Sequence, residues 1–302
     1  MKIAISGLGR MGSQIAKKLH EGGHIVIAHN RSSGLVDEMK TLGMIGAYTK
    51  EEVISSFDSN EQVIIWLMVP SDVVDSELDI WLTIIPKGSI LIDGGNSKWS
   101  DSKRRAEKVK ESGSVLLDIG TSGGVWGYQN GFSMMCGGES DSFEIIKPAL
   151  ETLKNPEGMY SYFGESGSGH YVKMVHNAIE YGMMESLAEG YRLLKEGPYK
   201  NLDLYKAGEV WQHHSVITSW LNELTRDIVK DNPNQDSVEG VVAESGEARW
   251  ALEVAKEFNI DTPAIQTSFD VRLDSQKGKV NFATKLLASM RNAFGGHKIN
   301  EK

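Results

Sequence analysis

The sequence predicts an α/β protein, in which an N-terminal doubly wound domain of mainly parallel strands is followed by an all-helical C-terminal domain. Short apolar runs alternate with helix-like segments over the first half of the 302 residues, a pattern typical of parallel sheets covered by helices on both faces. The run Gln62–Val69 is apolar almost throughout, as expected for a strand buried on both faces. Strand-like alternation ends at the glycine- and serine-rich segment Gly164–Gly169, beyond which the pattern is helical.

The predicted elements follow one another in the order of an open α/β sheet. Strands are expected at Lys2–Ser6, His24–His29, Gln62–Val69, Ser89–Asp93 and Ser114–Asp118, with helices at Arg10–Glu21, Gly34–Leu42, Ser71–Ile84 and Ser97–Ser112. Two later strands, Phe132–Cys136 and Met159–Phe163, flank a helix at Ser140–Leu153. A long helix from about His170 to Glu196 is stopped by Gly197-Pro198, because a flexible residue followed by proline cannot continue it. We expect one domain over residues 1–165 and a second over residues 166–302.

Composition and charge narrow the class of protein. The 41 acidic residues outnumber the 32 basic ones and give a formal net charge of −9, the sign opposite to that of a typical nucleic-acid binder. The most basic stretch, Lys103–Lys110, is interrupted by Glu107 and is interpreted as a solvated helix face. No apolar run approaches the roughly 18 residues of a membrane span, and the apolar start is too short for a signal peptide. We expect a cytoplasmic globular protein with neither a nucleic-acid nor a membrane partner.

Cysteine and histidine content predicts neither a structural disulfide nor a metal centre. Cys136 is the single cysteine, so a disulfide within the chain is excluded, and we interpret this residue as a buried, unreactive thiol. The adjacent His213 and His214 point to different faces of a helix, and no cluster of further ligands follows them in the sequence.

A glycine-rich loop directly follows the first predicted strand and opens the first predicted helix. Its residues are Gly7, Leu8, Gly9, Arg10, Met11 and Gly12, which match the pattern G-x-G-x-x-G. In that pattern the first glycine permits a tight turn, the second lets the backbone approach a pyrophosphate, and the third allows close packing of helix on strand. The N–H groups at the start of the helix then face the phosphates. This context predicts a Rossmann-type, dinucleotide-binding domain rather than a chance glycine turn.

The end of the second predicted strand indicates which dinucleotide is preferred. NAD sites usually place an acidic residue there, which accepts a hydrogen bond from the ribose 2′-hydroxyl. Here Asn30, Arg31 and Ser32 follow the strand, and the first carboxylate is Asp37. Arg31 is able to stack on adenine and to pair with a 2′-phosphate, while Asn30 and Ser32 add hydrogen bonds. The pattern favours NADP, with NAD as the second choice; the alternative is a surface arginine beside an NAD-preferring site.

The long predicted helix carries four polar residues on one face. Lys173, His176, Asn177 and Glu180 are spaced at i, i+3, i+4 and i+7, so that a base, an imidazole, an amide and an acid form one stripe. Such a stripe suits proton transfer to and from a substrate. The alternative, which spacing alone leaves open, is a solvated face with Lys–Glu pairing.

Two glycine-containing loops are expected at the carboxyl ends of strands. The segments Asp93–Ser97 and Gly120–Gly124 each follow an apolar strand, and ligands of open α/β sheets bind beyond these ends. Asn96 and Ser122 supply polar side chains there. The alternative is that both loops are ordinary tight turns.

These motifs together resemble the decarboxylating 6-phosphogluconate dehydrogenases, in a short form, over nearly the whole chain. The segments GLGRMG, IDGGNS, TSGG, KMVHNAIEYG and RNAFGGH all appear in order. IDGGNS together with KMVHNAIEYG is specific, whereas the glycine loop alone is not. The resemblance implies oxidative decarboxylation of 6-phospho-D-gluconate to D-ribulose 5-phosphate and CO2, with reduction of NADP+ or NAD+. It also implies a part in the pentose phosphate pathway or gluconate utilization, and a homodimer or homotetramer.

The resemblance implies roles residue by residue. Lys173 matches the general base, and Glu180 matches the acid that protonates the product carbon. Substrate contacts are implied for Asn96, Ser122, Gly123, Gly124, His176, Asn177, Tyr181, Arg272, Arg291 and His297. Among these, Tyr181 and Arg272 match phosphate contacts, and Asn96 matches a residue between substrate and nicotinamide. Cofactor contacts are implied for the glycine loop, for residues 30–32, for Asn96, and for Val69, Pro70 and Ser71, where the family's backbone meets the cofactor ribose. Arg291 and His297 match a C-terminal tail that reaches the active site of a neighbouring subunit.

One segment departs from the long form of this family. Where long-form members have a lysine and a threonine near the substrate phosphate, this chain has Ser245 and Glu247. A glutamate that faces a phosphate dianion repels it, so either Arg249 compensates or Glu247 points away. Two further functions therefore stay open: a β-hydroxyacid dehydrogenase that acts on a small hydroxy acid without decarboxylation, and a non-catalytic NADP-binding regulator.

Overall fold

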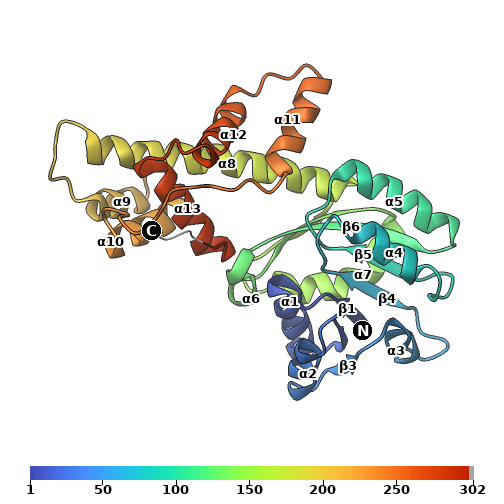
Figure 1. Cartoon of the computed structure of the whole chain (residues 1–302). Helices are drawn as coiled ribbons and strands as arrows, with labels where there is room; N and C mark the ends of the chain where they lie inside the picture. The colour runs from blue at the N-terminus through green and yellow to red at the C-terminus, as the bar shows by residue number, and fades with distance from the viewer. Residues whose placement is uncertain (299–302) are drawn as a thin grey trace. The chain divides into compact units, whose positions relative to one another are not determined.

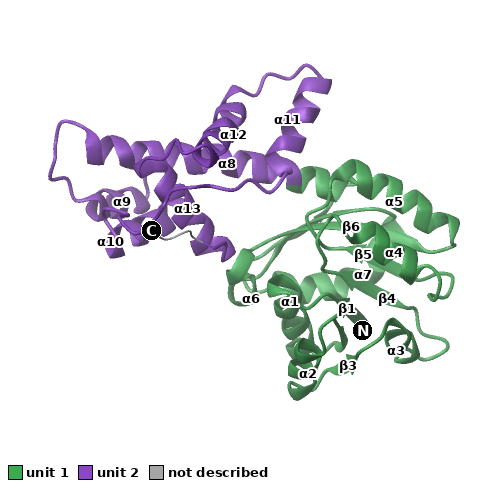
Figure 2. Ribbon diagram, in the orientation of Figure 1, with its two compact units in different colours: residues 1–173 green, residues 174–302 purple. Residues whose placement is uncertain are grey.

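The computed structural model describes residues 1–298, which divide into two compact units (Figure 2). The first unit runs from Met1 to Lys173, and the second begins at Met174. The first is built on a β-sheet, whereas the regular elements of residues 174–298 are all helices. The predicted class, a doubly wound α/β domain followed by an all-helical domain, is confirmed.

An eight-stranded sheet crosses the first unit in the order β3-β2-β1-β4-β5-β6-β7-β8 (Figure 1). The strands are β1 Lys2–Ser6, β2 Ile25–His29, β3 Ile45–Ala47, β4 Ile64–Leu67, β5 Ile90–Asp93, β6 Val115–Ser122, β7 Ser133–Gly137 and β8 Tyr160–Tyr162. Strands β1 to β6 are parallel to one another, β7 is antiparallel to β6, and β8 is parallel to β7. Because β2 and β4 lie on opposite sides of β1, the winding of the chain reverses there. Ligands of open sheets bind at such switch points.

Two regions of the sheet differ from the sequence-based prediction. Strand β3 and the short helix α3 (Lys50–Ser55) are not predicted, because a three-residue edge strand that contains glycine shows too little alternation. Strand β6 is longer than the predicted Ser114–Asp118, since residues 120–122 pair with β7. These residues, expected in the loop that follows the strand, therefore end the strand itself, and the loop begins at Gly123.

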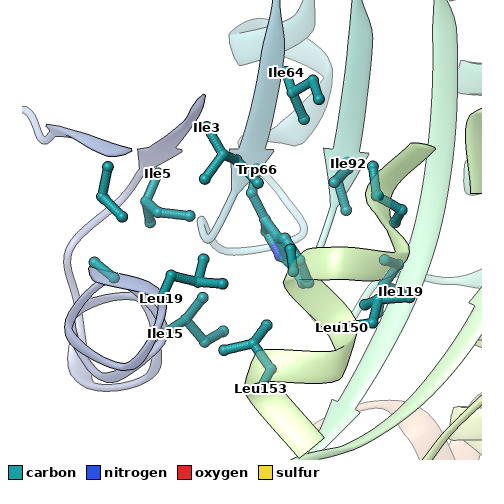
Figure 3. Packing of buried hydrophobic residues seen from close by; sticks show 14 of the residues in the cluster. Ile3, Ile5, Ile15, Leu19, Ile64, Trp66, Ile92, Ile119, Leu150 and Leu153 are labelled. Carbon is teal, nitrogen blue, oxygen red and sulfur yellow. The ribbon is translucent and has the colours of Figure 1, made fainter. Parts of the chain in front are cut away.

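Alternate residues of each strand pack against helices on opposite faces of the sheet. On one face, Ile3, Ile5 and Trp66 of the strands pack against helices α1 (Arg10–Glu21), α2 (Ser33–Thr41) and α7 (Ser140–Lys154). Figure 3 shows this cluster, to which α1 contributes Ile15 and Leu19 and α7 contributes Leu150 and Leu153. On the other face, Ala4, Ile65 and Leu67 pack with α3, α4 (Val74–Trp81) and α5 (Trp99–Glu111). Burial of both faces explains the nearly continuous apolar runs in the sequence.

The second unit packs helices around its own apolar core. Helix α8 (Ser168–Glu196) begins in the first unit and continues into the second, where it is followed by α9 Leu204–Gln212, α10 Trp220–Asp231, α11 Glu247–Glu257, α12 Pro263–Gln276 and α13 Phe282–Gly295. Met184 and Tyr191 of α8 pack with Leu286 and Leu287 of α13. The predicted stop of α8 at Gly197-Pro198 is confirmed. None of the helices within residues 1–298 combines the length and apolarity that crossing a membrane requires.

Candidate active site

The glycine loop between β1 and α1 has the conformation that a bound pyrophosphate requires. Gly7 has a φ of +101°, and a Cβ on it would lie 2.4 Å from the carbonyl oxygen of Met68. A Cβ on Gly12 would lie 1.9 Å from the carbonyl oxygen of Gly7, so only glycine lets α1 start so close to β1. Apart from Gly9 itself and the residues adjacent to it in the chain, no heavy atom lies within 4 Å of the Cβ position of Gly9, the N-cap of α1. The start of the helix is therefore open to a phosphate, and these residues fit a dinucleotide.

The end of β2 is tied to the glycine loop by Asn30. The backbone N–H of Leu8 donates to Asn30 Oδ1 at 3.0 Å, and Asn30 Nδ2 donates to the carbonyl oxygen of Ser32 at 3.3 Å. Asn30 therefore holds the loop in shape, in addition to its predicted place beside the cofactor. Arg31 and Ser32 are exposed, which leaves the guanidinium accessible to a ligand at this edge.

The loops after β4 and β5 are joined by a buried arginine that the sequence does not single out. Arg105 of α5 donates from Nη2 to the carbonyl oxygen of Ser71 (3.0 Å) and to Asp75 Oδ2 (2.9 Å). Its Nη1 reaches Asp93 Oδ2 at 3.4 Å and Ser97 Oγ at 3.1 Å. The guanidiniums of Arg104 and Arg105 hold the pKa of the Asp75 carboxyl well below its usual range.

The interpretation of Lys103–Lys110 as a solvated face is therefore wrong at Arg105, whose side chain is only 3% exposed. The reason is tertiary: α5 lies on the sheet beside the buried carboxylate of Asp93, which a sequence pattern does not reveal. The predicted contact residues Val69, Pro70 and Ser71 follow β4 in the loop that Arg105 holds. Asn96 is exposed in the loop after β5.

The start of α8 is anchored to strand β6 by the carboxylate of Asp118. Asp118 Oδ1 accepts from the N–H of Gly167 at 2.7 Å, and its Oδ2 accepts from the N–H of His170 at 2.9 Å. A negative charge at a helix N-terminus satisfies free N–H groups and is favoured by the helix dipole. The backbone is also in close contact, since a Cβ on Gly169 would lie 2.5 Å from the carbonyl oxygens of Asp118 and Met135. Asp118 is not among the predicted site residues, although a carboxylate inside a buried strand is a visible signal in the sequence.

This anchoring places Lys173 against the carboxyl-terminal part of β6. Lys173 is 6% exposed, and a Cβ on Gly120 would lie 2.3 Å from its Cβ and 2.7 Å from its Cγ. Ser122, Gly123 and Gly124 follow on the same strand and turn, and all three are half-buried. Glycine at position 120 therefore lets the lysine stem lie directly on the strand.

Replacing Gly120 with alanine is expected to reduce turnover about 100-fold, because the added methyl group must displace the Lys173 stem and displacements of about 1 Å cost that much. Dinucleotide affinity should stay within about twofold, since the glycine loop is untouched. Steady-state kinetics and cofactor titration measure the two effects. Gly190→Ala on α8 is the matched control, because nothing except its chain neighbours and the backbone of its own helix lies within 4 Å of its Cβ position. Equal activity of both variants would contradict this contact.

The predicted stripe on α8 is partly buried rather than a solvated face. His176, Asn177 and Glu180 are half-buried, while Lys173 is buried. The ring nitrogen Nδ1 of His176 lies 2.9 Å from Asn177 Oδ1, and Asn177 Nδ2 donates to Glu247 Oε1 at 3.0 Å. Glu247 thus contacts the stripe directly, a partner that the sequence does not reveal.

A cluster of buried cations lies beside Tyr181 in the second unit. The guanidinium carbon of Arg272 is 3.2 Å from the centroid of the Tyr181 ring, and Ser245 N donates to Tyr181 Oη at 3.3 Å. Burial, with a smaller contribution from the nearby Arg291, lowers the pKa of Arg272 to about 10, whereas Tyr181 opposes the shift. Burial also lowers the pKa of Arg291, against the opposing effects of Tyr181 and Glu180. Two buried guanidiniums that disfavour each other's charge favour an anionic ligand.

The remaining predicted residues lie at the end of α13. Arg291 is 9% exposed and lies close enough to Tyr181 of its own chain to interact with it electrostatically. The carbonyl oxygen of His297, which follows the helix, accepts a hydrogen bond from Asn292 Nδ2 at 2.8 Å. Arg291 thus lies near Arg272 and Tyr181 of its own chain, and the reach of the tail into a neighbouring subunit stays a prediction. Cys136 is buried in β7, and burial raises the pKa of its thiol to about 12, in line with an unreactive core residue.

Each of the two units matches a known family of protein domains. Residues 2–164 match the model of the NAD binding domain of 6-phosphogluconate dehydrogenase, and residues 169–302 match that of the 6-phosphogluconate dehydrogenase C-terminal domain. The chain is 38% identical to YqeC, a Bacillus subtilis protein of this family, with 100% of both chains covered. It is 34% identical to an NAD(+)-dependent, decarboxylating 6-phosphogluconate dehydrogenase of Haloferax volcanii, over 100% of this chain and 99% of the relative.

A solved structure supports the same relation. The 6-phosphogluconate dehydrogenase of Plasmodium falciparum, determined apo, with its cofactor NADP+ and with its substrate 6-phosphogluconate, superposes with a TM-score of 0.83 at 28% identity, over 99% of this chain and 66% of that one. The conformation of the glycine loop and the cofactors named for the relatives both indicate that the first unit binds a nicotinamide dinucleotide. The chain belongs to the 6-phosphogluconate dehydrogenase family of oxidoreductases.

Proposed function

We propose that the protein oxidises and decarboxylates 6-phospho-D-gluconate to D-ribulose 5-phosphate and CO2, with NADP+ or NAD+ as hydride acceptor. The observation that carries the proposal is the face of α8, where Lys173 and Glu180 stand about two helical turns apart with His176 and Asn177 between them. A reaction that removes a proton from oxygen and later adds one to carbon needs a base and an acid at separate points. Family membership and the buried arginine pair support the same substrate class.

The first step is the oxidation of the hydroxyl group β to the carboxylate. A nicotinamide dinucleotide held by the glycine loop would supply the redox chemistry, as the acceptor of the hydride from that carbon. Lys173, as the neutral amine, takes the hydroxyl proton, so that the alcohol carbon becomes a ketone and the substrate a β-keto acid. The buried position of Lys173 against Gly120 holds its stem in place for this transfer.

The second step breaks the bond between the α-carbon and the carboxylate. The electron pair of that bond moves toward the ketone, the Lys173 ammonium returns its proton to the ketone oxygen, and CO2 leaves. The product is an enediol that needs a proton on carbon. Glu180, in its protonated form, delivers that proton to carbon and is left as a carboxylate, while the neutral amine of Lys173 takes the proton of the enediol hydroxyl, so that the C=O bond of the ketose forms.

The substrate phosphate is assigned to the second unit. We propose that Arg272, Arg291 and Tyr181 bind the dianion, because two buried cations lie together there. Glu247 is also buried, at 3% exposure, and it accepts a hydrogen bond from Asn177, which lies one helical turn before Tyr181 on α8. This carboxylate favours the alternative function, a β-hydroxyacid dehydrogenase that acts on a small unphosphorylated acid without decarboxylation.

The deciding experiment is nicotinamide reduction on addition of 6-phosphogluconate, with NADP+ and NAD+ in parallel and with released CO2 trapped. One CO2 per reduced nicotinamide is expected, and gluconate without the phosphate should react at least about 100-fold more slowly, because the charge-assisted bonds to phosphate are lost. Turnover on small hydroxy acids without CO2 would establish the alternative. Cofactor binding without turnover on any sugar acid would indicate a regulator.

Replacing Arg31 with alanine is expected to raise the KM for NADP+ about 10- to 100-fold and to change the KM for NAD+ by less than about threefold. The reason is that Arg31 is exposed at the end of β2, where a 2′-phosphate would form charge-assisted hydrogen bonds with it. Parallel kinetics with the two cofactors measure the split. An equal change for both cofactors would show that Arg31 does not read the 2′-phosphate.

A further inference from the structure

Glu247 is a buried acid whose position is fixed by a turn before α11. It is the first residue of that helix and 3% exposed. The preceding Gly246 has a φ of +99°, and its N–H donates to Glu244 Oε2 at 2.7 Å. The sequence places Glu247 where long-form relatives have a phosphate contact, yet its Oε1 accepts from Asn177 Nδ2 at 3.0 Å. One of its partners is thus another side chain of the candidate site.

The contacts form a directed chain from Glu247 to His176. A carboxylate only accepts hydrogen bonds, so the Asn177 group that faces it must be the NH2 group. The amide oxygen of Asn177 then faces His176, 2.9 Å from Nδ1. An amide oxygen also only accepts, so Nδ1 of the imidazole must carry the proton. In a neutral imidazole with the proton on Nδ1, Nε2 is the acceptor.

We propose that Glu247 is a positioning residue that sets the tautomer of His176 through Asn177. The neutral ring is held with its proton on Nδ1, so that Nε2 accepts a hydrogen bond from a substrate hydroxyl rather than donating one. Glu247 therefore acts on substrate recognition through Asn177 and is not a direct phosphate ligand. The tautomer claim stands on the contacts alone, and only its consequence for turnover rests on the proposed function.

Two substitutions separate this role from a purely structural one. E247Q removes the charge but keeps an acceptor oxygen at the same reach, so the chain of hydrogen bonds survives. E247D keeps the negative charge at the N-terminus of α11, where it favours the helix, but is one methylene too short for Asn177. If Glu247 positions Asn177, E247Q should keep the wild-type tautomer of His176 and the wild-type activity, and E247D should lose both. If only the negative charge at the helix N-terminus matters, E247D should keep them and E247Q should lose them. Glu257→Gln, at the exposed end of the same helix, is the control.

The primary readout is the tautomer of His176 in the full chain, from two-bond ¹⁵N–¹H correlations of histidine-labelled protein, with the His176 signal assigned by its loss in H176Q. At a pH where the ring is neutral, wild type and E247Q should show the Nδ1–H form, and E247D should shift toward the Nε2–H form. A wild-type ring with its proton on Nε2, or an unchanged ring in E247D, would overturn the proposal.

Kinetics provide the second readout. We expect kcat/KM for 6-phosphogluconate to fall about 10- to 100-fold in E247D and to stay within about threefold of wild type in E247Q. The reverse order of the two variants would show that only the helix charge matters and would overturn the proposal. If 6-phosphogluconate is not a substrate while the tautomers follow the expected order, the proposed function fails and the positioning role stands.

Discussion

Replacing Lys173 with methionine is expected to lower kcat for the sugar acid by about 10³- to 10⁴-fold, the contribution typical of a positioned general base with an additional electrostatic role. Methionine has a similar length and keeps the packing on Gly120, so the fold should persist. Dinucleotide affinity should change by less than about twofold, because the glycine loop and Arg31 are intact. Steady-state kinetics with 6-phosphogluconate, together with fluorescence titration of the reduced cofactor, measure both quantities.

Two further variants define what Lys173 does. Lys173→Arg keeps a positive charge but cannot become a neutral base near neutral pH, so it should be as inactive as the methionine variant. Lys195→Met, near the other end of α8, is the matched control, because its amine donates to the carbonyl oxygen of Pro233 and to Asn234 Oδ1, far along the helix from the stripe. Substantial turnover in the arginine variant would show that charge rather than proton abstraction is required.

Replacing Arg105 with methionine is expected to lower the free energy of unfolding by about 3–5 kcal/mol, the usual cost of leaving one partner of a buried ion pair uncompensated. The side chain of Asp93 is 1% exposed and would lose the cation that lies 3.4 Å away. The loops after β4 and β5 would lose their shared tether at Ser71 and Ser97, so the Kd for dinucleotide should rise about 10-fold or more. Urea unfolding and cofactor titration measure these effects.

A neighbouring arginine supplies the control for this prediction. Arg104 also bonds Asp75 at 2.9 Å, but its side chain is 55% exposed, so Arg104→Met should change stability by less than about 1 kcal/mol. The double variant Arg105→Met with Asp93→Asn should recover part of the loss, because no buried charge is then left unpaired. Similar small losses for both single arginine variants would contradict the tether.

The organisation of the chain could be predicted from local patterns. Alternating strands and helices, a glycine loop at residues 7–12 and the stop at Gly197-Pro198 depend on backbone conformation and on burial of both sheet faces, which short stretches of sequence encode. The spacing of Lys173, His176, Asn177 and Glu180 likewise follows from helix geometry alone. Local sequence is therefore sufficient to identify most of the elements and the α8 stripe.

What the sequence by itself determined is the class of fold, the dinucleotide loop and the residues on one face of α8. Only the tertiary structure decided that Asp118 anchors α8, that Gly120 seats Lys173, that Arg105 is buried rather than solvated, and that Glu247 bonds Asn177. The physical reason is that these contacts join residues between 12 and 70 positions apart in the chain and depend on burial that distant residues create. Local periodicity specifies which face a side chain occupies, but long-range packing specifies which partner it meets there.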